Sequence, residues 1–255
     1  MARNAVLIPR ETNYPVARVL SEDVLSQYNE ALKGFVSDTP SLYRDRVKKS
    51  LDVFSKKNGE LVGSNSFAPI LLRGVLSKDS RLATMADIGL ALERGLDLKG
   101  NYEDVGVVLR SGKDSYENNA FLAQELEKQL KGKGINLDNP KAIYFDALNL
   151  RRDGNSVYGL AFDLSDRAEL GKTIIDAPEL DHKNEGSRFS KFDERGMPVF
   201  ILQGGDKTLY TKSDGLSRLN LYGGLYLNSI WIDLQGSNSY GRVVVVSGGA
   251  TRTEK

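Results

Sequence analysis

Apolar side chains recur at helical spacing through the first part of the chain. Val24, Leu25, Tyr28 and the apolar positions that follow predict an amphipathic helix over 22–36, with Ser21 as its N-cap. A second helix is predicted to begin at Thr39-Pro40, with proline at the favoured first position, and to end in the basic turn 56–59. Shorter helices are expected over 66–76 and 81–94.

The middle of the chain predicts one strand and one further helix. Residues 102–110 contain a continuous apolar stretch that is typical of a buried strand. Asp114 and Glu117 form a capping-box pattern, which predicts a helix to about Lys131 that Gly132 and Gly134 close. The first half therefore reads as helices around one or two strands.

After Asn139-Pro140 the apolar period becomes that of strands. Residues 141–150 and 155–164 flank Asp153-Gly154, a strong signal for a two-residue hairpin turn. A last strand, 242–247, contains four consecutive valines, and we expect it to be central or covered, because an exposed edge of this kind would aggregate. Two more hairpins are expected, 199–203 with 207–212 and 216–222 with 225–234.

The predicted fold class is α+β, with a helical N-terminal half followed by a mostly antiparallel, β-rich C-terminal half. We expect a mainly helical region over 1–140 and a β-rich region over 141–247, either separate or sharing one core. Residues 176–198 form a long polar, glycine- and proline-containing segment, which is typical of a functional or mobile loop. The polar tail 248–255 is expected to be disordered.

The hairpin at Asp153-Gly154 predicts a pair of acidic side chains. In that register Phe145 faces Phe162, and Asp146 and Asp163 become diagonal neighbours on the opposite face, roughly 7–8 Å apart. Two carboxylates at this separation bind a divalent cation or shift each other's pKa. The pattern predicts a Mg²⁺ or Mn²⁺ site, with Asp166 as a third ligand. The alternative is a solvated face on which each aspartate pairs with a basic side chain.

Composition excludes several chemistries. The 255 residues include no cysteine, which rules out disulfides, thiolate nucleophiles and iron–sulfur clusters, and one histidine, His182, which leaves no zinc motif of paired histidines. Residues 170–173, Leu-Gly-Lys-Thr, resemble the end of a phosphate loop, but Asp166 occupies the position of the first glycine, and Pro178 shortens the helix that should follow. A surface turn is the better interpretation of that segment, and a solvated loop position is the better one for His182.

Two surfaces remain as candidate contacts. The chain has 35 basic and 34 acidic residues, so a nucleic-acid footprint has to be local. The segment 43–57 provides one, because its polar face is mainly basic, although most such faces are simply solvated. The C-terminal aromatics provide a stacking surface unless they fill a β core or an oligomer interface. The basic candidates are Arg44, Lys48, Lys49, Lys56 and Lys57, and the aromatic candidates are Tyr210, Tyr222, Tyr226, Trp231 and Tyr240.

The sequence favours a non-enzymatic binding or interaction protein, because every catalytic motif that was tested is incomplete. One alternative is a divalent-metal-dependent phosphoryl-transfer enzyme or nuclease that uses Asp146 and Asp163. A second is a nucleic-acid-binding protein that uses the helix predicted over 43–57. No apolar run approaches the roughly 18 residues of a membrane helix, and the N-terminal apolar run is too short for a signal peptide. We therefore expect a cytoplasmic protein whose β-rich region is available for oligomerisation.

Overall fold

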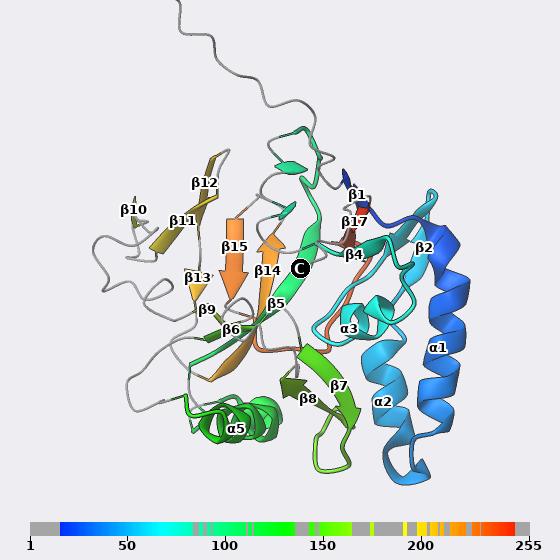
Figure 1. Ribbon diagram of the computed structural model, residues 1–255, viewed down its shortest axis with the longest axis vertical. Coiled ribbons are helices and arrows are strands. Elements are labelled where there is room, and N and C mark those ends of the chain that lie inside the picture. Colours follow the sequence, from blue (N-terminus) through cyan, green and yellow to red (C-terminus); the bar gives the residue numbers. More distant parts are fainter. Residues whose placement is uncertain are drawn as a thin grey trace, which may run out of the picture.

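The protein has a mixed α+β fold, as the sequence predicts. The computed structural model contains a central β-sheet covered by helices, with a smaller sheet beside it (Figure 1). The structure describes residues 16–83, 87–88, 91–92, 94–110, 112–113, 115–135, 143–145, 148–164, 174–175, 191–192, 198–202, 205–208, 210–211, 215–222, 226–229 and 231–247.

The central sheet has seven strands, with β5 (Tyr102–Leu109) and β14 (Leu216–Tyr222) in its middle. β5 pairs antiparallel with β14 and with β6 (Ile143–Phe145), and parallel with β16 (Gly241–Arg242). The strand predicted over 102–110 is therefore confirmed. The outer strands are β9 (Ile174–Ile175) at one end and β15 (Tyr226–Ser229) and β13 (Tyr210–Thr211) at the other.

Both hairpins predicted after residue 198 are present, but the second strand of the first one ends at Thr208, and residues 210–211, which were predicted to continue it, form β13 in the central sheet. β11 (Pro198–Leu202) pairs with β12 (Gly205–Thr208), and β10 (Lys191–Phe192) adds to the same small sheet. β14 pairs with β15 across residues 223–225. The second strand of that hairpin ends at Ser229, so the predicted extension to residue 234 is wrong.

The valine-rich strand lies in the centre of a separate three-stranded sheet. β17 (Val244–Ser247) pairs antiparallel with β1 (Val16–Val19) on one side and with β4 (Ser80–Leu82) on the other. The four valines, Val243 to Val246, are 0–3% exposed. The expectation that this strand is protected is confirmed.

The helices predicted in the first half are present with shifted ends. Residues 22–36 form η1 (Glu22–Val24) and α1 (Leu25–Ser37), although the Ser21 hydroxyl donates to Asp23 and makes no capping hydrogen bond. The helix predicted over 66–76 is α3 (Ala68–Arg73), and the one predicted from 114 is α5 (Glu117–Gly132). Residues 87–88 and 91–92 are helical, and β4 occupies the start of the predicted segment 81–94.

The second predicted helix is too long. After η2 (Ser41–Tyr43), α2 (Arg44–Leu51) ends before the basic turn, and residues 55–57 form β2 (Ser55–Lys57), paired with β3 (Glu60–Val62). Asn58 and Gly59 have φ values of 52° and 81°. Positive φ at both positions is the geometry of a two-residue hairpin turn, so Asn-Gly joins two strands here and does not cap a helix.

The hairpin predicted at Asp153-Gly154 has a different turn. β7 (Leu148–Arg152) pairs with β8 (Leu160–Leu164), but seven residues, 153–159, connect them. Phe162 faces Leu150, five positions from its predicted partner Phe145. The predicted register is therefore wrong, and Phe145 belongs to β6 in the central sheet.

Tertiary packing accounts for the wide turn. The Tyr158 side chain is buried, its hydroxyl donates to Asn119 Oδ1 at 2.6 Å, and its ring lies 5.1 Å from that of Phe67. Arg46 donates to the main-chain oxygens of Ser156 and Gly154 at 2.8 and 3.1 Å. The seven-residue connection therefore places Tyr158 where it contacts Asn119 and Phe67, and it is Arg46 that holds the main chain of the turn.

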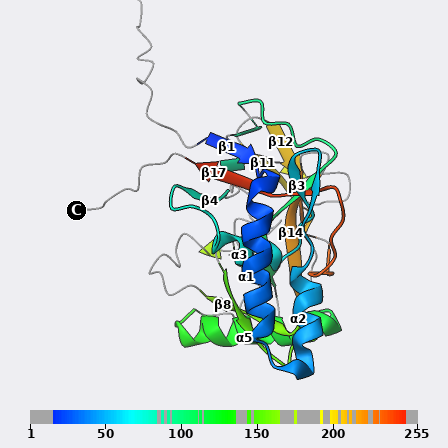
Figure 2. The same cartoon turned by 90° about the vertical axis from the view of Figure 1, so that its right-hand side faces the viewer.

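Two apolar clusters lie on opposite sides of the central sheet. Val107 and Leu109 of β5 contact the larger cluster, together with α1, α2, α3, α5 and the β7–β8 hairpin, whereas Val105 and Val108 contact the smaller one. α1 and α2 lie side by side (Figures 1 and 2), and in the view of Figure 1 the β7–β8 hairpin lies between α2 and α5. β5 therefore reads as a nearly continuous apolar run because both of its faces are buried.

The division into a helical half and a β-rich half holds only in part. The described helices lie before residue 135, but β1 to β5 belong to the same half of the sequence. The seven-stranded sheet and the three-stranded sheet of β1, β17 and β4 each combine strands from the two predicted regions, since β5 pairs with β14 and β1 pairs with β17. The two regions thus share sheets.

The central position of β17 predicts slow amide exchange. Its strand hydrogen bonds to two neighbours, together with complete burial, require a large unfolding event before these amides open. In native-state hydrogen exchange, we expect the amides of Val244 to Val246 to be among the most protected. Exchange as fast as that of the exposed residues 238–240 would contradict the central position of the strand.

Candidate binding pocket

A buried polar segment precedes α3. Asn65 is fully buried, and its Oδ1 accepts hydrogen bonds from the main-chain N–H groups of Phe67 and Ala68 at 2.9 and 2.8 Å. Its Nδ2 donates to the main-chain oxygens of Ser50 and Gln235 at 2.7 and 3.0 Å. The side chain thus joins the end of α2, the start of α3 and the C-terminal loop, and it fixes the neighbouring Ser66 in position.

A buried ion pair lies across β5 and β14. The Arg218 guanidinium contacts both carboxylate oxygens of Asp104, and the two side chains are 8% and 3% exposed. Arg218 also donates to the main-chain oxygens of Ser64 and Gly236 and lies 4.8 Å from the Tyr102 ring. Burial by itself lowers the pKa of Arg218, but Asp104 outweighs it and the pKa is raised, so the guanidinium stays charged.

A bulge in β5 brings these two residues together. Leu219 faces Gly106 and Asn220 faces Asp104, so β5 carries one extra residue, Val105, at this point. The extra residue places Asp104 on the same face as Val107, the residue that Arg218 faces across the strands. The bulge therefore places Asp104 on the face of the sheet where Arg218 can reach it.

The adjacent residue, Glu103, is buried, and among the described residues no basic side chain pairs with its carboxyl. Its Oε1 accepts a hydrogen bond from the main-chain N–H of Val244 at 2.7 Å, and its buried Oε2 has no hydrogen-bond partner. Burial raises the pKa of the Glu103 carboxyl well above its usual value, opposed by the hydrogen bond from Val244 and assisted by the nearby Asp104. Burial therefore disfavours the charged form of this carboxyl.

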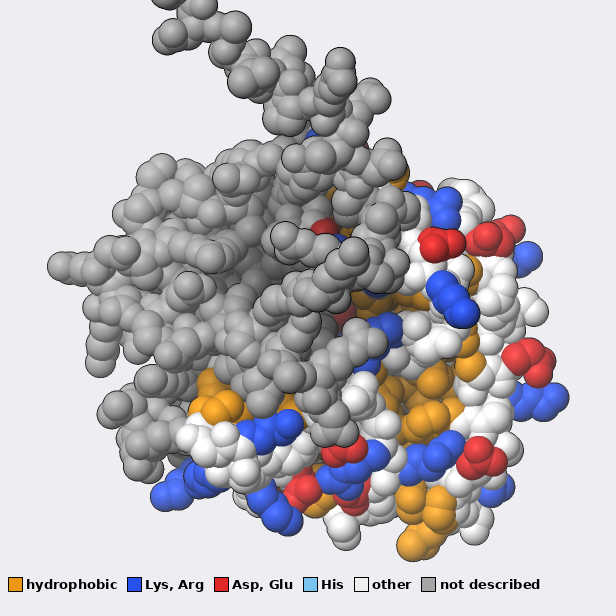
Figure 3. Space-filling view, viewed as in Figure 1, with side chains coloured by type: hydrophobic (Ala, Val, Ile, Leu, Met, Phe, Trp, Pro, Cys, Tyr) orange, Lys and Arg blue, Asp and Glu red, His pale blue; other side chains and the backbone are white. Residues whose placement is uncertain are grey.

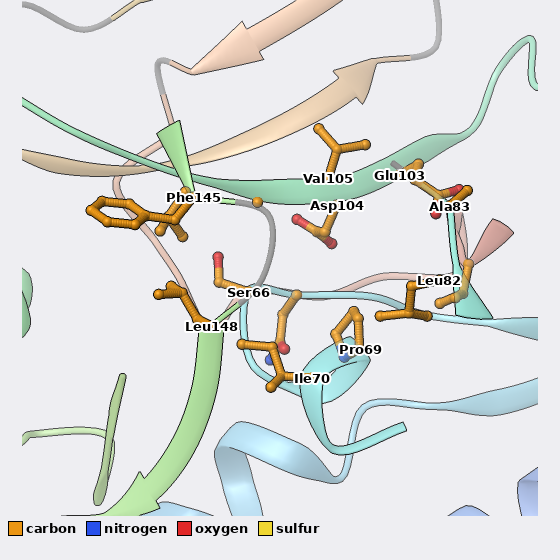
Figure 4. Close-up of a pocket in the computed structure, with 14 residues that line it drawn as sticks. Ser66, Pro69, Ile70, Leu82, Ala83, Glu103, Asp104, Val105, Phe145 and Leu148 are labelled. Carbon is orange, nitrogen blue, oxygen red and sulfur yellow. The ribbon is translucent and has the colours of Figure 1, made fainter. Parts of the chain in front are cut away.

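These residues surround a cavity of about 50 Å³ between β5 and the start of α3. Asp104 extends from β5 toward the α3 segment, Ser66 extends toward β5, and Glu103 lies at the end beside Ala83 (Figure 4). The Oγ of Ser66, a residue 7% exposed, has no hydrogen-bond partner. The apolar part of the lining includes Pro69, Ile70, Leu82, Phe145 and Leu148.

The predicted metal ligands are not brought together by the part of the chain that is described. Asp163 faces Asn149 across β7 and β8, and its Oδ1 accepts a hydrogen bond from Arg151 at 2.8 Å. Arg151 also pairs with Asp153 and, at 2.8 Å, with Glu125. Asp146 and Asp166 lie outside the described residues. The register that predicted the site is wrong, and metal binding stays an untested prediction.

Among the described residues, no group of three or more histidine and acidic side chains is arranged to hold a metal ion. His182 and residues 170–173, the segment that resembles a phosphate loop, both lie outside the described part of the chain. The long segment 176–198 is described only at residues 191–192.

The basic segment 43–57 is divided between structural and solvent-facing side chains. Arg44 donates to the main-chain oxygens of Thr39 and Ser37, and these hydrogen bonds join the start of α2 to the end of α1. The four exposed lysines do not form a purely positive surface: Lys49 lines an open depression of about 500 Å³ together with Asp52 and Asp233. On the face shown in Figure 3, described basic and acidic side chains are interspersed. The exposed lysines are Lys48, Lys49, Lys56 and Lys57.

The C-terminal aromatics are described in part. Trp231 and Tyr240 are 47% and 61% exposed, as a stacking surface requires. The side chains of Tyr210, Tyr222 and Tyr226 lie outside the description, although their main chains belong to β13, β14 and β15. The stacking surface stays a prediction.

Sequence reasoning missed the pocket residues. Glu103 and Asp104 are consecutive acids at the start of a strand that is otherwise apolar, and acidic residues are depleted in strands and rarely buried. Two acidic residues in a strand that is otherwise apolar and buried are unusual, and this was the signal in the sequence that could have indicated the pocket. The identity of the counter-ion, Arg218, was not predictable, because it lies more than one hundred residues away and depends on the bulge.

Comparison with protein-family models, with curated proteins and with solved structures finds no match. Within the described residues, no helix is both long and apolar enough to cross a membrane.

Proposed function

We propose that the protein is a non-enzymatic binding protein whose ligand occupies the cavity between β5 and α3. The observation that carries the proposal is the pair of buried polar atoms at this cavity that have no partner, Ser66 Oγ and Glu103 Oε2. A buried polar group without a hydrogen bond costs about 1–3 kcal/mol. A ligand that supplies the missing hydrogen bonds recovers that cost.

The composition of the lining supports binding of a small molecule. Ligand pockets are mostly apolar and carry a few placed polar groups that set orientation. Here the apolar side chains of Ile70 and Phe145 face a small polar set that includes Ser66 and Asp104. Since Asp104 is held by Arg218 and Ser66 follows the anchored Asn65, the polar atoms are fixed before a ligand enters.

A cavity-filling variant tests this proposal. We expect 1-propanol, added to the wild-type protein in an NMR titration, to shift the amide resonances of Ser66, Ile70 and Leu148. Ile70→Phe places a larger side chain in the cavity and should abolish these shifts. Leu71→Phe is the matched control, because Leu71 lies on the same helix and is not among the residues that line the cavity.

Two results would contradict binding at this site. One is that wild-type protein shows no saturable shift with 1-propanol or with a charged analogue of the same length. The other is that Ile70→Phe and Leu71→Phe behave alike, since that places the bound molecule elsewhere.

Both alternative functions remain predictions. A phosphoryl-transfer enzyme or nuclease would need Asp146 or Asp166 to complete a metal site with Asp163, which is itself bound to Arg151. A nucleic-acid-binding protein would rely on the four exposed lysines near α2 and β2. Neither alternative explains the unpartnered polar atoms at the cavity.

A further inference from the structure

The cavity between β5 and the start of α3 has two separate polar ends. Glu103 and Asp104 are consecutive residues of β5, so their side chains point to opposite faces of the strand. In Figure 4, Glu103 lies at one end of the pocket, beside Ala83. Ser66 lies toward the other end, near Leu148, and Asp104 lies between the two ends. The hydrogen bonds that are missing at Ser66 and at Glu103 are therefore separate requirements.

The polar atoms around Ser66 suit a ligand group that both accepts and donates a hydrogen bond. Ser66 Oγ is buried and has no partner, so its O–H is available as a donor. The Asp104 carboxylate only accepts, and both of its oxygens contact Arg218 while each keeps a further lone pair. Ser66 and Asp104 extend toward each other from opposite walls of the cavity (Figure 4). A hydroxyl group between them would accept from Ser66 and donate to Asp104.

The charges at this end of the cavity favour a neutral ligand. Asp104 and Arg218 form a pair that is neutral as a unit, so a second cation beside Asp104 would also meet the repulsion of the guanidinium. Among the described residues that line the cavity, none is lysine, arginine or histidine, so an anion would have no counter-charge. Either ion would lose its hydration in a buried cavity, and this loss costs more for an ion than for a neutral group.

The apolar lining restricts what the hydroxyl group is attached to. Ile70, Phe145 and Leu148 present carbon atoms beside Ser66, and these suit a short alkyl chain. A single buried water needs about 10–15 Å³ of such volume, so a cavity of about 50 Å³ holds about four non-hydrogen atoms. A propyl chain that carries one hydroxyl has this size.

On these grounds we infer that the cavity binds a neutral hydroxyalkyl group, either as a short primary alcohol or as the end of a longer ligand. The hydroxyl accepts from Ser66 and donates to Asp104, and the alkyl carbons contact Ile70, Phe145 and Leu148. This inference rests on the proposed binding function, because it names the ligand class of the same cavity.

Four probes with the same number of non-hydrogen atoms separate the ligand class from the existence of the site. NMR titration at one ionic strength uses 1-propanol, acetone, n-propylammonium and acetate. We expect 1-propanol to bind at least about tenfold more tightly than either ion, because the ions lose more hydration. It should bind at least about threefold more tightly than acetone, which accepts from Ser66 but has no O–H to donate to Asp104.

The position of bound 1-propanol tests recognition at Ser66 in the wild-type protein. Intermolecular nuclear Overhauser effects should connect its protons to the Phe145 ring and the Leu148 methyl groups. Contacts with Leu82 and Ala83 instead would place the alcohol at the Glu103 end and overturn recognition by Ser66.

One variant and a matched control check the hydrogen bond from Ser66. Ser66→Ala removes the O–H donor and should weaken 1-propanol at least about threefold. Ser77→Ala changes an exposed serine that does not line the cavity and should leave the affinity unchanged. Equal affinities of the two variants would overturn recognition by Ser66.

The remaining outcomes distinguish the ligand class from the proposed function. If n-propylammonium or acetate binds as tightly as 1-propanol, the preference for a neutral ligand is wrong and the binding site stands. If acetone binds as tightly as 1-propanol, the requirement for a hydroxyl donor is wrong and the site again stands. If none of the four probes binds, both the ligand class and the proposed function at this cavity fail.

Discussion

Replacing Arg218 by methionine should destabilise the protein by about 3–5 kcal/mol, the cost of leaving one partner of a buried ion pair unpaired. Asp104 is 3% exposed and would lose both guanidinium contacts, and the main-chain oxygens of Ser64 and Gly236 would each lose a donor. Methionine has a similar length and fills much of the same volume. Urea unfolding, followed by circular dichroism, measures the change in the free energy of unfolding.

Arg81→Met is the matched control. Arg81 pairs with Asp87 at 2.5 Å, but its side chain is 52% exposed, and exposed ion pairs contribute at most about 1 kcal/mol. If Arg218→Met is too unstable to purify, the double variant Arg218→Met with Asp104→Leu removes the unpaired charge and should recover most of the loss. A change below 1 kcal/mol in Arg218→Met would show that the ion pair is not buried in solution.

Asn65→Ala should be the second most damaging change, with an expected loss of about 3 kcal/mol. The substitution leaves two N–H groups at the start of α3 and two main-chain oxygens, those of Ser50 and Gln235, without their partners. All four contacts lie in the protein interior or near it. The midpoint of urea unfolding measures the effect. In hydrogen exchange, a loss of protection at the amides of α3 would locate the effect there.

An asparagine with a local contact provides the comparison. Asn101 donates to the main-chain oxygen of Lys99 in an exposed turn, and Asn101→Ala should change stability by less than about 0.5 kcal/mol. Equal effects of the two substitutions would mean that Asn65 does not connect α2, α3 and the C-terminal loop as the structure indicates.

The local pattern of apolar and polar residues predicted most of the regular structure, because this pattern depends on which face of each helix or strand is buried. Helix α1 follows an apolar stripe at helical spacing, α5 follows a segment predicted from a capping-box pattern, and β5 follows a continuous apolar run. The protection of β17 was also predictable, since four adjacent valines are tolerated only where both strand edges are covered. These inferences need only neighbours in sequence.

Errors arose where a local signal had two outcomes. Asn58-Gly59 suits both a helix end and a hairpin turn. The basic residues before it, such as Lys56, are typical of the last turn of a helix, so the local sequence did not favour the hairpin that forms. Asp153-Gly154 suits a tight turn, but seven residues connect the two strands, and Tyr158 in that connection contacts Asn119 and Phe67. The resulting shift of register removed the predicted neighbour of Asp163 and gave it Asn149 instead. A shift of an odd number of positions exchanges the faces of a strand.

The sequence by itself determined the α+β class, the main helices, the buried valine strand and the absence of cysteine and paired-histidine chemistry. Only the tertiary structure decided which polar residues meet. The ion pair of Asp104 with Arg218, the unpartnered Glu103 and the cavity beside Ser66 depend on a bulge and on contacts between segments far apart in the chain. Backbone periodicity encodes which face is buried, whereas pairing of buried polar groups depends on register across strands, and that register is a property of the whole fold.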